Sequence, residues 1–333
     1  MSDFPFAEEL QVALAAVRQA AIACRSVQDG ITTESLDKKD KSPVTVADFA
    51  SQAIICKALL DAFPDDPVIG EEGAAELRTE NGANFLNQVV AECQNAGCEG
   101  SADDVCDWID RGNLQEYRQR FWTLDPIDGT KGFLRKEQYA ISLALVVDGQ
   151  IQVGILGCPN MPTAADDANA PQGILAWATQ GQGSFYLPLD QQDATAKVLR
   201  VSETADTTDA KFCESVESGH SSHSWSGQIA ESLGITKEPF RIDSQCKYLA
   251  VAMGSADIYL RLPTRPGYVE KIWDHAGGIL IVEEAGGTVS DIAGKSIELT
   301  HGATLNSNEG IVVTNGRFHD QVVSAVTEKR PAK

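Results

Sequence analysis

The sequence lacks any apolar run that approaches the ~18 residues needed to cross a bilayer. Its first ten residues, MSDFPFAEEL, are acidic and lack the basic start of a signal or transit peptide. No two cysteines have the CxxC spacing of a zinc ribbon or a thioredoxin-like motif. These absences predict a soluble, cytoplasmic protein without a membrane partner, with the nucleus as an additional compartment.

A basic surface for nucleic acid is also missing, because the 333 residues carry a net charge of −21. The acidic excess is uneven. Residues 61–128 hold sixteen Asp or Glu and four Lys or Arg, whereas residues 240–275 hold four acidic and five basic residues. Most of this excess is expected to be solvated surface, but a few of the carboxylates could share a cation.

The cysteines give no sign of a metal site. Eight are present, and without a secretion signal they are expected to be reduced thiols. Cys93, Cys98 and Cys106 cluster, but no histidine lies near them in sequence, so their spacing argues against zinc.

Hydrophobic periodicity predicts helices over residues 6–27 and from about Thr45 to Phe63, after a break at Ser42-Pro43. Short buried strands are expected at 68–72 and in four β-rich runs, namely 121–125, 139–149, 150–159 and 173–186. From residue 198 onward, strand and helix patterns alternate. We therefore expect two domains, 1–195 and 196–333, with the least regular patterns at 73–119 and 161–172.

In the stretch WTLDPIDGTKGF (122–133), a strand-like run is followed by two aspartates, Asp125 and Asp128. Their carboxylates and the intervening carbonyl of Ile127 are the oxygen ligands that Mg²⁺ prefers. Gly129 and Thr130 allow a turn into a helix, whose first N–H groups favour phosphate. The same residues also fit an ordinary β-turn, and they do not match an EF-hand loop.

Each of the other acidic motifs, taken alone, also fits an ordinary structural role. Glu71 and Glu72 follow a predicted strand, and such a pair is usually solvated. Asp274 has the position of an N-cap before an apolar helix. Residues 45–48, TVAD, fit a capping box in which Asp48 is the acidic member.

As a set, GEE (70–72), DPIDGT (125–130) and WDHAGG (273–278) resemble the paired signatures of the inositol monophosphatase superfamily, whose members are magnesium-dependent, lithium-sensitive phosphatases. The resemblance covers nearly the whole chain. It implies an α+β or α/β fold, a layered αβαβα sandwich of the inositol monophosphatase and fructose-1,6-bisphosphatase type. Further stretches resemble the 3'(2'),5'-bisphosphate nucleotidase branch, particularly its fungal form: SPVTVADFASQ (42–52), FPDDPVIGEE (63–72), RFWTLDPIDGTKGFLR (120–135), GHSSH (219–223), DSQCKY (243–248) and YLRLP (259–263).

That branch removes the 3'-phosphate of adenosine 3',5'-bisphosphate (PAP) to give AMP, and also acts on the sulfated analogue, PAPS. The resemblance implies two to three Mg²⁺ per site, and metal-binding positions at Glu71, Asp125, the carbonyl of Ile127, Asp128 and Asp274. Clustered carboxylates repel one another and favour protonation. Divalent cations would remove that conflict, and inhibition by Li⁺ is expected from the family.

The resemblance also assigns the reaction and substrate positions. Asp48 and Thr130 match the water-activating pair of the family, and Gly129 and Thr130 would offer N–H groups to the phosphate. Substrate contacts are implied at His220, Ser244, Lys247 and Arg261. Without the resemblance, Lys247 and Arg261 are most simply surface charges.

One position departs from the family, because Gly277 stands where a second alanine is usual, and glycine costs roughly 0.5–1 kcal/mol in a helix interior. The expected protein is a monomeric nucleotidase whose partner is a small nucleotide, PAP or PAPS, and not a nucleic acid. Three alternatives stay open: an inositol (poly)phosphate 1-phosphatase of the same superfamily, a catalytically silent nucleotide or metal sensor, and a structural acidic protein.

Overall fold

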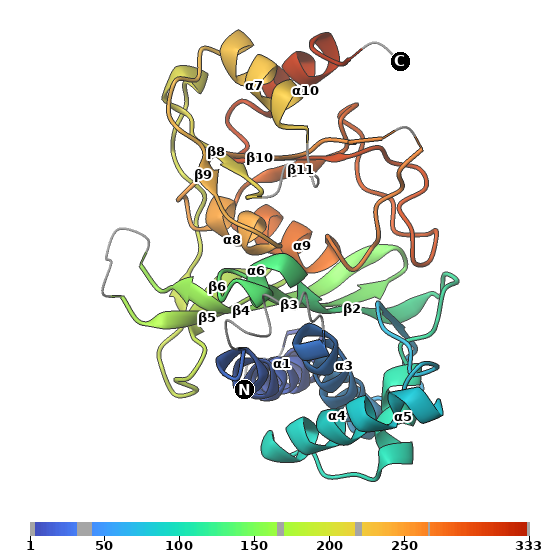
Figure 1. The fold of residues 1–333 in the computed structure, drawn as a ribbon. Helices are drawn as coiled ribbons and strands as arrows, with labels where there is room; N and C mark the ends of the chain where they lie inside the picture. The colour runs from blue at the N-terminus through green and yellow to red at the C-terminus, as the bar shows by residue number, and fades with distance from the viewer. Residues whose placement is uncertain (1–3, 32–41, 165–169, 217–221, 266, 332–333) are drawn as a thin grey trace.

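The computed structural model describes residues 4–31, 42–164, 170–216, 222–265 and 267–331, which form five stacked layers (Figure 1). Helices α1 (Ala7–Asp29) and α3 (Ser42–Ala62) cover one face of a seven-stranded sheet. Helices α8 (Cys246–Ala252) and α9 (Ala276–Glu284) separate it from a five-stranded sheet. The outer face of the second sheet carries α7 (His223–Ser232) and α10 (His319–Glu328). The expected αβαβα sandwich is confirmed.

The first sheet has the order β1-β2-β3-β4-β5-β6-β7. Its first pair is parallel, and all other neighbours are antiparallel. The segment expected to be one strand at 173–186 is a hairpin, since Gly181 has a φ of +74° and turns the chain. The strands are β1 (Val68–Gly70), β2 (Arg120–Asp128), β3 (Ala140–Val147), β4 (Gln150–Pro162), β5 (Gln172–Thr179), β6 (Gly183–Pro188) and β7 (Lys197–Val198).

The second sheet has the order β11-β12-β10-β8-β9, with β8 parallel to both of its neighbours and β12 antiparallel to both of its own. Its strands are β8 (Phe212–Glu214), β9 (Phe240–Arg241), β10 (Ile258–Arg261), β11 (Thr288–Ser290) and β12 (Ile311–Thr314). Because α8 and α9 come from the second half of the chain but cover the first sheet, one apolar cluster joins the two halves. The domain boundary at 195 stays a prediction.

The irregular region 73–119 contains the 3₁₀ turn Glu80–Gly82 and two helices, α4 (Ala83–Asn95) and α5 (Ala102–Asp110). A capping box of Ser101 and Asp104 starts α5. The short helix α6 (Thr130–Leu134) follows β2, and a second 3₁₀ turn spans Thr207–Asp209.

The capping box predicted at 45–48 is wrong. Helix α3 begins at Ser42, so Thr45 is already inside the helix and Asp48 lies in its interior. Pro43 stands in the first turn, where proline costs no helical hydrogen bond. The apparent break before Thr45 is therefore the start of the helix.

Strand β3, AISLALVV, explains how the layers share one sheet. It is buried along almost its whole length, as expected for a strand covered on both faces. Because successive side chains point to opposite faces, Leu143 packs in the cluster under α1 and α3, and Ala144 in the cluster under α8 and α9. A third cluster lies between the second sheet and α7 and α10.

All eight cysteines are free and buried. No helix in the described part of the chain is long and apolar enough to cross a membrane.

Candidate active site

A cavity of about 360 Å³ contains most of the predicted site residues. Every predicted position lines it except Asp48 and His220. His220 lies outside the described residues, and Asp48 is buried in α3, 6% exposed, without reaching the described cavity wall. The lining includes Glu71, Asp125, Ile127, Asp128, Gly129, Thr130, Ser244, Lys247, Arg261 and Asp274.

Parallel pairing of β1 and β2 brings the first two acidic motifs together. Gly70 pairs with Leu124, so the residues that follow, Glu71 and Asp125, emerge at the same edge of the sheet. Gln52 of α3 fixes this edge from below: its Nε2 donates to the carbonyl of Glu72 at 2.5 Å, and its Oε1 accepts from the Glu72 N–H at 3.1 Å. Strand pairing therefore brings Glu71 and Asp125 together, and Gln52 holds the backbone directly after Glu71.

The DPID segment is a bulged strand end, not a free turn. Strand β2 continues to Asp128, and its register with β3 shifts between Asp125 and Asp128. Ser51 Oγ donates to the carbonyl of Pro126 at 3.0 Å. Gly129 then turns the chain into α6 with a φ of +94°, a conformation that favours glycine. The bulge turns both carboxylates and the Ile127 position toward one cavity.

The carboxylates in this cavity cannot all be ionised without an energetic penalty, because they are buried and close together. Burial, followed by the charges of Glu71 and Asp128, raises the pKa of Asp125 well above its usual range. Loss of water around Glu71, together with Asp274 and Glu72, raises the pKa of Glu71 to about 8. Burial, with Asp128 adding to it, raises the pKa of Asp274 to about 6.

A hard divalent cation fits this donor set. Asp125 is 1% exposed, and its Oδ1 has no hydrogen-bond partner within the described part of the chain. Side-chain donors in the acidic group are all carboxylate oxygens, the ligand type of Mg²⁺ and Ca²⁺. A cation would take up the unpaired oxygen and relieve the repulsion that raises the pKa values.

A second acidic group was not predicted. Ligand atoms of Glu270, Asp274 and His275 all lie within 4.8 Å of one another. Glu270 already has two partners, since its Oε1 lies 3.3 Å from the cationic Arg261 Nε and its Oε2 lies 3.3 Å from His275 Nε2. Although burial opposes the change, the hydrogen bond from His275 lowers the pKa of Glu270. Glu270 therefore supports the basic side of the cavity.

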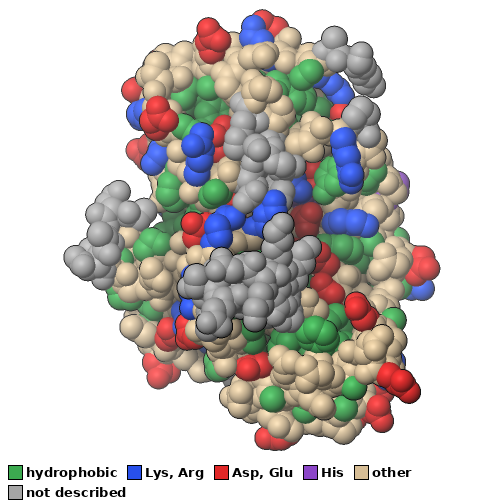
Figure 2. Space-filling view, in the orientation of Figure 1, with side chains coloured by type: hydrophobic (Ala, Val, Ile, Leu, Met, Phe, Trp, Pro, Cys, Tyr) green, Lys and Arg blue, Asp and Glu red, His purple; other side chains and the backbone are tan. Residues whose placement is uncertain are grey.

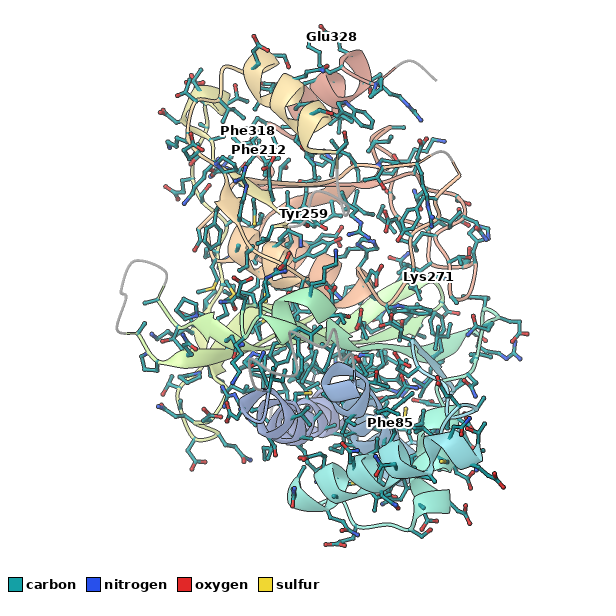
Figure 3. The ribbon with its side chains drawn as sticks, viewed as in Figure 1. Phe85, Phe212, Tyr259, Lys271, Phe318 and Glu328 are labelled. Carbon is teal, nitrogen blue, oxygen red and sulfur yellow. The ribbon has the colours of Figure 1, made fainter. Side chains whose placement is uncertain are left out.

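The opposite wall of the cavity is basic and aromatic. Lys247 of α8 is 3% exposed, and its Nζ lies 5.3 Å from the ring centroid of Tyr259. Tyr259 of β10 lies between the second sheet and α8 (Figure 3). Arg261 Nη2 donates to Tyr268 Oη at 3.4 Å. In the space-filling view, Lys and Arg side chains gather beside Asp and Glu side chains across the middle of this face (Figure 2).

Asp48 remains close to the acidic wall although it does not line the cavity. Burial, then the charges of Glu72 and Glu71, raises the pKa of Asp48.

Thr130 is exposed at the cavity, at the start of α6. Ser244 has a φ of +66°, an uncommon conformation for a residue other than glycine.

Sequence reasoning missed several lining residues, including Lys131, Gln245, Tyr259 and His275. Gln245 and Tyr259 lie inside the motifs DSQCKY and YLRLP, which carried the resemblance. Their presence in those motifs was the signal that could have found them.

Comparisons with known proteins identify the family and the fold of the chain. The chain matches the model of the inositol monophosphatase family over residues 6–330. It is 43% identical to a Schizosaccharomyces pombe protein named 3'(2'),5'-bisphosphate nucleotidase, over 98% of each chain. It is 40% identical to a Candida albicans protein named 3'(2'),5'-bisphosphate nucleotidase 2, over 99% of each. Among solved structures, an IMPase of Thermotoga maritima is similar with a TM-score of 0.63 and 21% identity, covering 97% of this chain and 98% of that one.

Proposed function

The chain belongs to the inositol monophosphatase family, and on this basis we propose that it is a Mg²⁺-dependent 3'(2'),5'-bisphosphate nucleotidase. It hydrolyses the 3'-phosphate of PAP to give AMP and phosphate, and converts PAPS to adenosine 5'-phosphosulfate (APS). The observation that carries the proposal is one cavity with a carboxylate wall facing a basic wall of Lys247 and Arg261. Relatives named for this activity, at 40–43% identity over nearly the full chain, support the substrate.

Five positions are proposed to hold two to three Mg²⁺: Glu71, Asp125, the carbonyl of Ile127, Asp128 and Asp274. The buried, unpartnered Oδ1 of Asp125 and the raised carboxyl pKa values support this assignment. When bound, Mg²⁺ neutralises charge on the phosphate and makes water a better nucleophile. The carboxylates of these residues and the Ile127 carbonyl would hold the cations in the cavity.

Asp48 and Thr130 are proposed to activate the attacking water, with Asp48 as the base that finally takes its proton. A raised pKa suits this role for Asp48, because a carboxylate with a higher pKa is a stronger base. Thr130 follows Gly129 at the cavity, where the backbone turn can approach a phosphate. The two residues come from α3 and from the start of α6, which follows the DPID bulge.

The basic wall is proposed to bind the part of the nucleotide that does not react. Lys247 and Arg261 neutralise the second phosphate, and the planar guanidinium of Arg261 can contact two of its oxygens. Ser244 and His220 are proposed as further substrate contacts. The ion pair with Glu270 holds the Arg261 side chain in place before substrate binds.

The proposal is tested by measuring phosphate release from PAP, PAPS and inositol phosphates at saturating Mg²⁺, with malachite green as the readout. Turnover of PAP well above that of inositol phosphates is expected. A preference for an inositol phosphate would favour the inositol phosphate 1-phosphatase alternative. Binding of PAP without release of phosphate would favour the silent sensor. We further propose a monomeric protein of the cytoplasm, with the nucleus as an additional compartment.

A further inference from the structure

Gln245 lies between two of the three segments that carry acidic residues of the cavity, namely the DPID bulge and the segment before Asp274. It is 2% exposed and lines the cavity. Its backbone N–H donates to Asp128 Oδ2 at 2.5 Å. Its side-chain Nε2 donates to the carbonyl of Trp273 at 2.9 Å, directly before Asp274. One residue therefore contacts both segments, which are far apart in the sequence.

The chemistry of the neighbours fixes the orientation of the Gln245 amide. Its Oε1 accepts from Ser142 Oγ at 3.1 Å and from the Gly278 N–H at 3.3 Å. A backbone N–H can only donate and the Trp273 carbonyl can only accept, so a flipped amide would lose both bonds. A carboxylate at this position would lack the donor that Trp273 requires. The amide thus joins β3, the WDHAGG segment and α9.

The backbone around Gln245 is shaped for these contacts. Ser244 occupies the left-handed region, and its Oγ accepts from the Cys246 N–H at 3.2 Å. Such a conformation is unfavourable for a non-glycine residue and is kept where the surroundings require it. Gly129 packs against this turn, because a Cβ there would lie 2.8 Å from Ser244 Cβ. The turn directs the Gln245 N–H at Asp128.

We infer that Gln245 is a positioning residue of the metal site, which holds Asp128 and Asp274 at the separation needed to share cations. The inference rests on the proposed function, because the cation is the Mg²⁺ of that site. Contacts that orient metal ligands typically change metal affinity 10–100-fold when they are removed. Loss of the Gln245 amide is therefore expected to weaken Mg²⁺ binding.

The test is Gln245→Met, which keeps an unbranched side chain but removes all three side-chain hydrogen bonds. Binding of Mg²⁺ alone is measured by titration calorimetry without substrate, and unfolding by urea in EDTA. The expected result is a loss of about tenfold or more in Mg²⁺ affinity, with turnover recovering at high Mg²⁺. The matched control is Asn315→Leu, which removes a buried amide bonded to Ser202 Oγ and the Thr204 carbonyl, remote from the cavity.

Asn315→Leu should lose stability and keep its Mg²⁺ affinity. If Gln245→Met also kept the wild-type affinity, Gln245 would be only a structural residue and the inference would be overturned. If wild-type protein bound no Mg²⁺, the proposed function itself would fail. Should Gln245→Met not fold, Gln245→Asn retains the amide but is one methylene too short for all partners. It is expected to weaken Mg²⁺ binding as well, and unchanged affinity would overturn the inference.

Discussion

Replacing Asp274 by asparagine should stabilise the metal-free protein while removing its response to Mg²⁺. In the folded chain, burial and Asp128 raise the pKa of Asp274 from 3.8 to about 6. Ionisation of this group therefore opposes folding by at most about 3 kcal/mol, at about 1.36 kcal/mol per pKa unit. A gain on the order of 1–3 kcal/mol is therefore expected for the neutral isostere in EDTA near pH 8.

The pH dependence of the free energy of unfolding tests the sign of this effect. A carboxyl whose pKa is raised on folding contributes no penalty below its unfolded pKa, and the penalty grows as pH rises through the folded value of about 6. The advantage of Asp274→Asn should thus be small near pH 4 and complete above about pH 7. Urea unfolding in EDTA at both pH values measures it, and a repeat with Mg²⁺ should reverse the order of stability. A variant that is less stable than wild type in EDTA at the higher pH would refute the reasoning.

Three further outcomes are expected. Gly277→Ala should destabilise the protein by about 1–3 kcal/mol in urea unfolding, despite the better helix propensity of alanine. The reason is that a Cβ at Gly277 would lie 2.7 Å from Ser142 Oγ and 3.0 Å from the Ile155 carbonyl; an unchanged or higher stability would contradict this. Asp48→Asn should abolish turnover but preserve nucleotide binding in titration calorimetry, whereas retained turnover would exclude Asp48 as the base. Millimolar Li⁺ at saturating Mg²⁺ should slow phosphate release, because Li⁺ is expected to replace one Mg²⁺ after cleavage and trap product; an unchanged rate would contradict that.

The regular parts of the fold could be predicted because they depend on local periodicity. The helix expected at 6–27 is α1, and the strand expected within 68–72 is β1. Their apolar patterns are strong, since α1 buries Leu10, Ala13 and Val17 on one face. Pairing between β1 and β2 involves residues more distant in sequence, and no local pattern encodes it.

The candidate site was predictable only in part, for a related reason. The resemblance named the carboxylates, but their supporting contacts belong to residues with ordinary local patterns. Gln52 and Gln245 are single amides, and their roles arise from partners brought together by folding. Asp48 was placed in a capping box because Pro43 resembled a break, although proline is well tolerated in a first helical turn.

A structural protein would not be expected to keep the arrangement around Asp125. Its carboxylate is buried beside Glu71 and Asp128, and one oxygen has no partner among the described residues. Burying such groups disfavours folding unless something pairs with them. Stability alone would favour neutral residues here, as the Asp274→Asn prediction states. The simplest account is that the fold tolerates repulsion in the metal-free state because a cation relieves it. The same carboxylates would then lower the stability of the metal-free protein and bind the cations that activity requires. Stability and activity can each be measured without the other.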